Sequence, residues 1–243
     1  MGSVIGDTYE TYSSHLKLVL LFSIPFIIAF AIPLLAPLPT YVSMGGIFLR
    51  SASIFTNLNA VGLAVIIAAF FFSLLFISFA FVAISLIVKA RRTHSKISRR
   101  VLNGIEKYIG KVFLIFIIYV ILLSVANVIG YYLGAEALLT GLVGFLAFIP
   151  VFYAPSAVVV DERGVMRAMS NSVRLVAKEP QYFVIWLVLI TVVLSLLSVF
   201  FTAVTGTFWS RYIILVLSSL FVLPYFVIFQ AEAYMKRFPI LKH

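Results

Sequence analysis

Residues 58–88 read LNAVGLAVIIAAFFFSLLFISFAFVAISLIV, a run that contains no Asp, Glu, Lys, Arg or His. A helix of about 20 mostly apolar residues crosses the hydrocarbon core of a bilayer, which is about 30 Å thick. This run is longer than one crossing needs, so a helix here must tilt or project beyond the membrane. We place the transmembrane part at residues 61–88.

Five further stretches are long and apolar enough to cross a membrane, and none has a charged residue in its interior. The six predicted spans lie at about 16–35, 61–88, 112–133, 138–160, 182–204 and 212–231. The chain is 63% apolar and 11% charged, whereas a soluble domain is about half apolar and a quarter charged. Residues 1–243 are therefore expected to form a single all-α, polytopic membrane domain.

The basic residues predict how this domain is oriented. Of the 18 Lys and Arg residues, 16 lie in the N-terminal segment, residues 89–111, residues 161–181 and the C-terminal tail. Only Arg50 and Arg211 lie in the alternate connectors. Because cytoplasmic loops are enriched in Lys and Arg, both termini are expected on the cytoplasmic side of the cell membrane. The net charge of +10 lies beside membrane spans, which favours contact with anionic lipid over nucleic acid.

Three cytoplasmic segments place apolar residues on one face of a helix: the N-terminal segment, residues 99–111 and residues 163–178. Each precedes an odd-numbered span, so we expect three transmembrane hairpins, each preceded by a cytoplasmic amphipathic helix. In the last segment, the apolar face is predicted to hold Val165, Met166, Met169, Val173 and Val176, opposite a polar face with Asn171. Helices of this kind bind an anionic inner leaflet or a protein partner. The basic residues expected to form this surface are Arg99, Arg100, Lys107, Arg163, Arg167, Arg174 and Lys178.

The junction before the fifth span reads PVFYAPSAVVVDERGVMRAMSNSVRLVAKEP over residues 150–180. It combines a proline near the inner end of a span with an acidic residue, a glycine and an Ala-x-x-x-Ser pattern. These positions are Pro155, Asp161 or Glu162, Gly164, Ala168 and Ser172. The pattern resembles a loose group of prokaryotic six-span membrane proteins, which includes the membrane domain attached to some glycerophosphoryl diester phosphodiesterases. The resemblance implies a membrane module of unknown function, and no phosphodiesterase catalytic domain accompanies it.

The sequence shows no constellation for catalysis. His15, His94 and His243 lie in separate segments, cysteine is absent, and neither H-E-x-x-H nor a phosphate-binding glycine loop occurs. We therefore expect no catalytic residue, metal site or cofactor. Asp161 and Glu162 are expected to cap a helix, with divalent-cation binding as an alternative.

Prolines interrupt several spans, and a proline frees a backbone carbonyl that can line a polar cavity. The candidate cavity residues are Pro150, Pro155, Pro224, Gln230 and Glu232. The predicted function is a non-catalytic membrane module that interacts with lipids or a membrane partner. The alternatives are a transporter or channel for an uncharged small solute or lipid, and a lipid-modifying enzyme that uses Asp161, Glu162 and Glu232.

Overall fold

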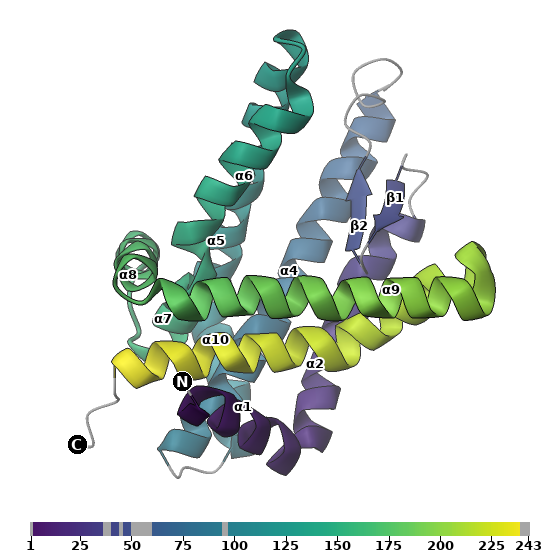
Figure 1. Ribbon diagram of the computed structural model, residues 1–243. Helices are drawn as coiled ribbons and strands as arrows, with labels where there is room; N and C mark the ends of the chain where they lie inside the picture. The colour runs from purple at the N-terminus through teal and green to yellow at the C-terminus, as the bar shows by residue number, and fades with distance from the viewer. Residues whose placement is uncertain (1, 36–39, 44–45, 50–59, 94–96, 239–243) are drawn as a thin grey trace.

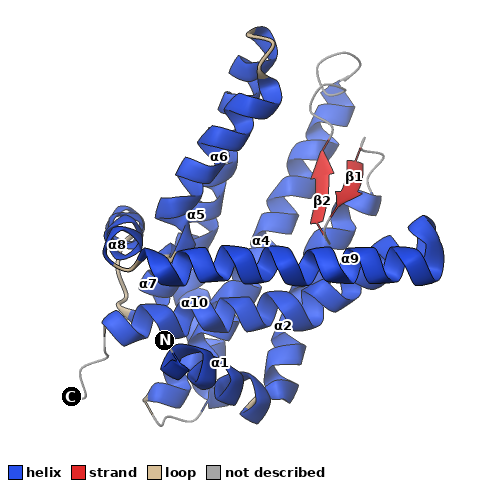
Figure 2. Cartoon of the chain, in the orientation of Figure 1, coloured by secondary structure: helices blue, strands red, loops and turns tan. Residues whose placement is uncertain are grey.

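The computed structural model describes residues 2–35, 40–43, 46–49, 60–93 and 97–238, and nearly all of this part is helical (Figure 1). The predicted all-α class is confirmed at this level. The helices are α1 (Gly2–Ser14), α2 (Leu16–Leu35), α4 (Ala60–Arg92), α5 (Ile97–Tyr132), α6 (Glu136–Phe152), α7 (Ala154–Val160), α8 (Val165–Lys178), α9 (Pro180–Leu217), the π-helix η1 (Ser218–Val222) and α10 (Leu223–Arg237). Two short strands, β1 (Thr40–Ser43) and β2 (Gly46–Leu49), pair antiparallel with Tyr41 opposite Phe48 (Figure 2).

Several of the helices are suited to a membrane. Four helical segments are long and apolar enough to cross it: Val61–Arg92, Gly104–Tyr132, Glu136–Val160 and Pro180–Arg237. A fifth candidate arises if α1 and α2, which meet at a bend of 91°, count as one broken span. By length and composition, the described part of the chain thus has four or five candidate spans.

The fifth and sixth predicted spans lie within one helical segment of 58 residues. Gly206 interrupts this segment with φ 73° and ψ 170°, a conformation open to glycine because it has no Cβ. On either side of Gly206 the chain folds back on itself, so that α9 and α10 lie antiparallel (Figure 1). Trp186 Nε1 donates to the carbonyl of Phe226 (3.1 Å), and Lys236 donates to the Tyr182 hydroxyl (3.0 Å).

Residues 99–111 differ from the prediction of a separate surface helix. They form the first turns of α5, which continues without a break to Tyr132. No proline interrupts this helix, and Gly110 has no neighbouring atom within 4 Å of its Cβ position. The other two predicted surface segments are separate helices, α1 and α8. Helix α8 ends where Pro180 starts α9, because proline is favoured in the first turn of a helix but not in its interior.

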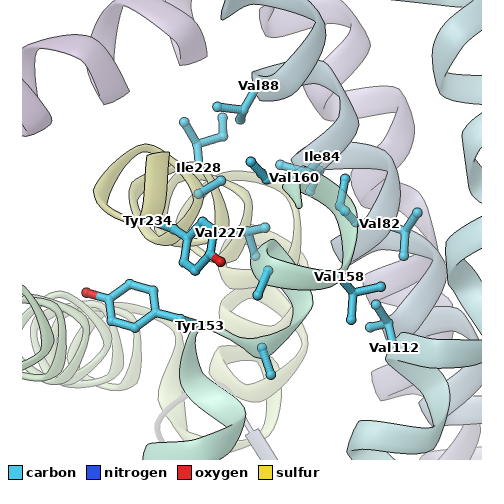
Figure 3. Close-up of a cluster of buried hydrophobic side chains, with 14 of the residues drawn as sticks. Val82, Ile84, Val88, Val112, Tyr153, Val158, Val160, Val227, Ile228 and Tyr234 are labelled. Atoms are coloured by element: carbon cyan, nitrogen blue, oxygen red, sulfur yellow. The ribbon is translucent and has the colours of Figure 1, made fainter. Parts of the chain in front are cut away.

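A cluster of buried apolar side chains lies where α4, α7 and α10 meet (Figure 3). Ile84 of α4, Val158 of α7 and Ile228 of α10 are all fully buried in this cluster. Apolar side chains far from it remain exposed: Leu138 near the start of α6 is 71% exposed and Val199 in α9 is 70% exposed. Among the described residues, the buried apolar side chains thus gather mainly at the end where the predicted cytoplasmic segments lie.

Candidate functional site

Helix α8 presents three different sides to its surroundings. Its buried side is formed by Ala168, Ser172 and Leu175. About a third of a turn round the helix, Met166 and Val173 form an apolar side and are 75% and 44% exposed. The remaining side is basic and exposed, and it is formed by Arg167, Arg174 and Lys178.

The orientation of α8 differs from the predicted division into two faces. Val176, predicted on the apolar face, is buried together with Asn171, predicted on the polar face. The rest of the protein contacts the small residues Ala168 and Ser172 together with one edge of the apolar stripe, where Val176 is buried and Val165 and Met169 pack against the core. Small side chains let α8 lie close to α6 and α7, which leaves Met166 and Val173 facing outward.

Ser172 has a specific structural role at the break between α6 and α7. Its hydroxyl donates to the carbonyl of Ile149 (2.6 Å) and accepts from the backbone N–H of Tyr153 (2.9 Å). In an uninterrupted helix the N–H of Tyr153 would donate to the carbonyl of Ile149, so the serine hydroxyl bridges the two groups in place of that hydrogen bond. Pro150 lies inside α6 and Pro155 in the first turn of α7, on either side of this break. The motif serine therefore satisfies backbone groups at the break.

The acidic residues of the motif do not cap α8. The N-cap position is Gly164, with φ −73° and no side-chain cap. Asp161 instead accepts from the hydroxyl of Tyr234 (2.7 Å) and from Nε of Arg163 (3.1 Å). Asp161 therefore joins the α7–α8 turn to the end of α10. At Gly164 itself, neither the backbone angle nor a close neighbouring atom requires a glycine.

Glu162 has three donors around its carboxylate. The hydroxyl of Tyr108 donates to Oε1 (2.7 Å), Nζ of Lys89 lies 3.4 Å from the same oxygen, and Lys107 donates to Oε2. The hydrogen bond from Lys107 and the one from Tyr108 are the main causes that lower the pKa of Glu162 from 4.5 to about 2. Lys89 also donates to the carbonyl of Val159 (2.7 Å), at the end of α7. This group ties α4 and α5 to the α7–α8 turn.

A second ionic group surrounds Glu232, which is fully buried. Arg92 donates to Oε2 of Glu232 from Nε (3.0 Å) and Nη2 (2.6 Å), and the hydroxyl of Thr11 donates to Oε1 (2.8 Å). The outer part of the group pairs Arg92 with Asp7 at 3.0 Å and Arg91 with Glu10 at 2.6 Å. The sequence prediction missed these pairs, although the signal was present. Acidic residues one turn apart in α1 face two adjacent arginines at the end of α4.

The proposed cavity residues lie on neighbouring elements. Pro155, Pro224 and Gln230 are buried, and the ring of Tyr153 lies 6.4 Å from that of Tyr234, where α7 contacts α10. Glu232 bonds to α1 and α4 instead, so it does not share the partners of Asp161 or Glu162. Arg99 and Arg100 lie in the first turns of α5.

Within the described residues, no three His, Asp or Glu side chains gather closely enough to hold a metal ion. No protein-family model matches the chain, and neither a curated protein nor a solved structure matches it.

Proposed function

We propose that this chain is a non-catalytic, six-span membrane module whose inner surface binds anionic lipid or a membrane partner. The observation that carries this proposal is the three-sided arrangement of α8. Its buried side packs on α6 and α7, while its apolar and basic sides face outward beside each other. A helix with an exposed apolar side next to a basic side lies in the headgroup region of a bilayer.

The length of the last helical segment supports the proposed number of crossings. A straight helix of 58 residues would be about 87 Å long, almost three times the thickness of the hydrocarbon core. The fold-back at Gly206 divides this segment into two antiparallel legs, each long enough to cross once. In Figure 1 both legs lie across the direction of α4, α5 and α6, so the six-span proposal requires them to turn toward that direction in the bilayer. With α2, α4, α5 and the pair α6–α7, the count becomes six. An even number of crossings puts both termini on one side.

The contacts at the inner end support the proposed orientation. Asp7 in the N-terminal segment pairs with Arg92, and Glu162 in the α7–α8 turn pairs with Lys89. Near the C-terminus, Tyr234 bonds to Asp161. These contacts bring together all four segments that hold 16 of the 18 basic residues. Such a concentration of Lys and Arg is typical of the cytoplasmic side.

The position of α8 is tested with nitroxide labels on the full chain in vesicles of phosphatidylglycerol and phosphatidylcholine. The chain has no cysteine, so single-cysteine variants need no other change. We expect labels at Met166 and Val173 to be more accessible to oxygen, which partitions into the bilayer, than to a water-soluble nickel complex. Labels at Arg167 and Lys178 should show the opposite preference. Equal, water-like accessibility at all four positions would refute an interfacial α8.

The two alternative functions have less support. A transporter was suggested by freed backbone groups near Pro150 and Pro155, yet the carbonyl of Ile149 and the N–H of Tyr153 both bond to Ser172. A lipid-modifying enzyme would need carboxylates acting together. Asp161, Glu162 and Glu232 instead bond to separate sets of side chains.

A further inference from the structure

The group around Glu162 has the form of an anion-binding site. Besides donating to the carboxylate, the ammonium groups of Lys89 and Lys107 lie over the ring of Tyr108, at 5.7 and 5.2 Å from its centroid. Two cations held beside the same ring repel each other, and an anion that contacts both offsets this repulsion. Glu162 supplies that anion from another part of the chain.

Glu162 is an exposed occupant of this position. Its side chain is 48% exposed and that of Lys107 is 54% exposed, whereas Lys89 is 12% and Tyr108 4% exposed, so the group is open on the side of Lys107 and Glu162. Glu162 has φ 57°, a left-handed conformation that residues with a Cβ seldom adopt. Because the Glu162 carboxylate is exposed and its backbone conformation is unfavourable, another anion can displace it from the two lysines.

The surface beside this group is suited to a lipid. Lys107 lies five residues before the predicted start of the third span at residue 112, which is about 8 Å along the helix axis. Leu114 and Ile121 follow at intervals of seven residues, so they share the helical face of Lys107. They are 46% and 55% exposed. The same face of α5 therefore leads from a cation at headgroup depth to exposed apolar side chains.

We propose that Lys89, Lys107 and Tyr108 form a binding site for the phosphate of an anionic phospholipid, and that Glu162 occupies this site when no lipid is bound. The site deepens the proposed function and rests on it. A phosphodiester carries one negative charge, as a carboxylate does, and its free oxygens accept the same charge-assisted hydrogen bonds. The acyl chains then lie along Leu114 and Ile121.

The test measures lipid binding to the full chain in detergent by native mass spectrometry, with phosphatidylglycerol and phosphatidylcholine compared. Glu162→Gln removes the competing carboxylate and is expected to raise phosphatidylglycerol binding about fivefold, the effect of about one unit charge near a membrane surface. Glu179→Gln removes an acid of the same inner end and serves as the matched control. An equal gain in both variants, or none in Glu162→Gln, overturns the proposal.

The donors are tested in the Glu162→Gln background. Adding Tyr108→Phe removes a hydroxyl without changing the charge, and adding Lys107→Gln removes a cation. Both are expected to reverse the gain, whereas adding Lys236→Gln, which removes a lysine beside a different tyrosine, leaves most of it. A gain that survives both Tyr108→Phe and Lys107→Gln refutes this site.

Two further arms separate the possible failures. Inorganic phosphate is added as a competitor, and displacement of phosphatidylglycerol at an equal concentration would assign the site to free phosphate instead of lipid. The nitroxide labels on α8 report the proposed function independently. If the α8 labels lie in the interface but Glu162→Gln does not change phosphatidylglycerol binding, only the phosphate site is rejected. If the labels are exposed to water but Glu162→Gln still raises phosphatidylglycerol binding, the interfacial position of α8 is rejected and the phosphate site is supported. Melting temperatures of all variants show whether each one folds.

Discussion

Replacement of Ser172 by alanine tests the break between α6 and α7. The hydroxyl of Ser172 bonds to the carbonyl of Ile149 and the N–H of Tyr153, and both Ser172 and Tyr153 are fully buried. A buried backbone group left without a partner costs about 1–3 kcal/mol. The two groups can partly recover by bonding directly if α6 and α7 straighten, so we expect Ser172→Ala to lower the free energy of unfolding by about 2 kcal/mol.

The matched control is Ser170→Ala, which makes the same change on the exposed side of α8 and is expected to cost less than about 0.5 kcal/mol. Unfolding is followed in mixed micelles by tryptophan fluorescence. Trp186 reports directly on this region, because its ring lies 5.0 Å from that of Phe152 at the end of α6. Equal unfolding free energies for Ser172→Ala and Ser170→Ala would show that the hydroxyl does not stabilise the break.

Three further predictions concern the ionic groups and the fold-back. Arg92→Met removes the main partner of the buried Glu232 and is expected to lower the free energy of unfolding by about 3–5 kcal/mol. The double variant Arg92→Met, Glu232→Met should recover most of this loss in the same unfolding assay. Equal losses in the single and the double variant would contradict the pairing. Because the pKa of Glu162 falls from 4.5 in the unfolded chain to about 2 in the folded protein, its ionised form stabilises the fold fully above pH 4.5. The stability difference between the protein and Glu162→Gln should therefore shrink as the pH falls from 4.5 to about 2, and a pH-independent difference would argue against the contact. Gly206→Ala is expected to cost about 1–3 kcal/mol because of its φ of 73°, whereas Gly141→Ala, inside helix α6 with open space around it, should be neutral or stabilising in thermal unfolding.

Helical segments were predictable where the signal is local. The apolar run that became α4 exceeds the length of one crossing, and its helix continues to Arg92 because nothing in residues 60–92 breaks it. The separate α8 was also predictable, since Pro180 favours a new helix at that point. The expected boundary near residue 112 was not found, because an amphipathic pattern that changes to an apolar one does not by itself interrupt a helix.

Side-chain partners were harder to predict. The motif containing Ser172 was recognised as a pattern, but its hydroxyl bonds to residues about 20 positions away, and only the approach of α8 to α6 brings them together. Glu232 was expected at the cytoplasmic end of the last span. Its burial depends on α1 and α4, whose partner residues lie 140 or more positions away.

Composition and periodicity alone determined that this chain is helical, apolar enough for a membrane and strongly basic in four segments, because each property depends on residues close together in the sequence. Only the tertiary structure decided which face of α8 is buried and which acid meets which base. It also decided where the last helical segment folds back. Those outcomes depend on contacts between elements distant in the chain, where small residues, freed backbone groups and buried charges must find partners. The tertiary structure thus places some of the basic residues on the exposed side of α8 and others around the carboxylate of Glu162.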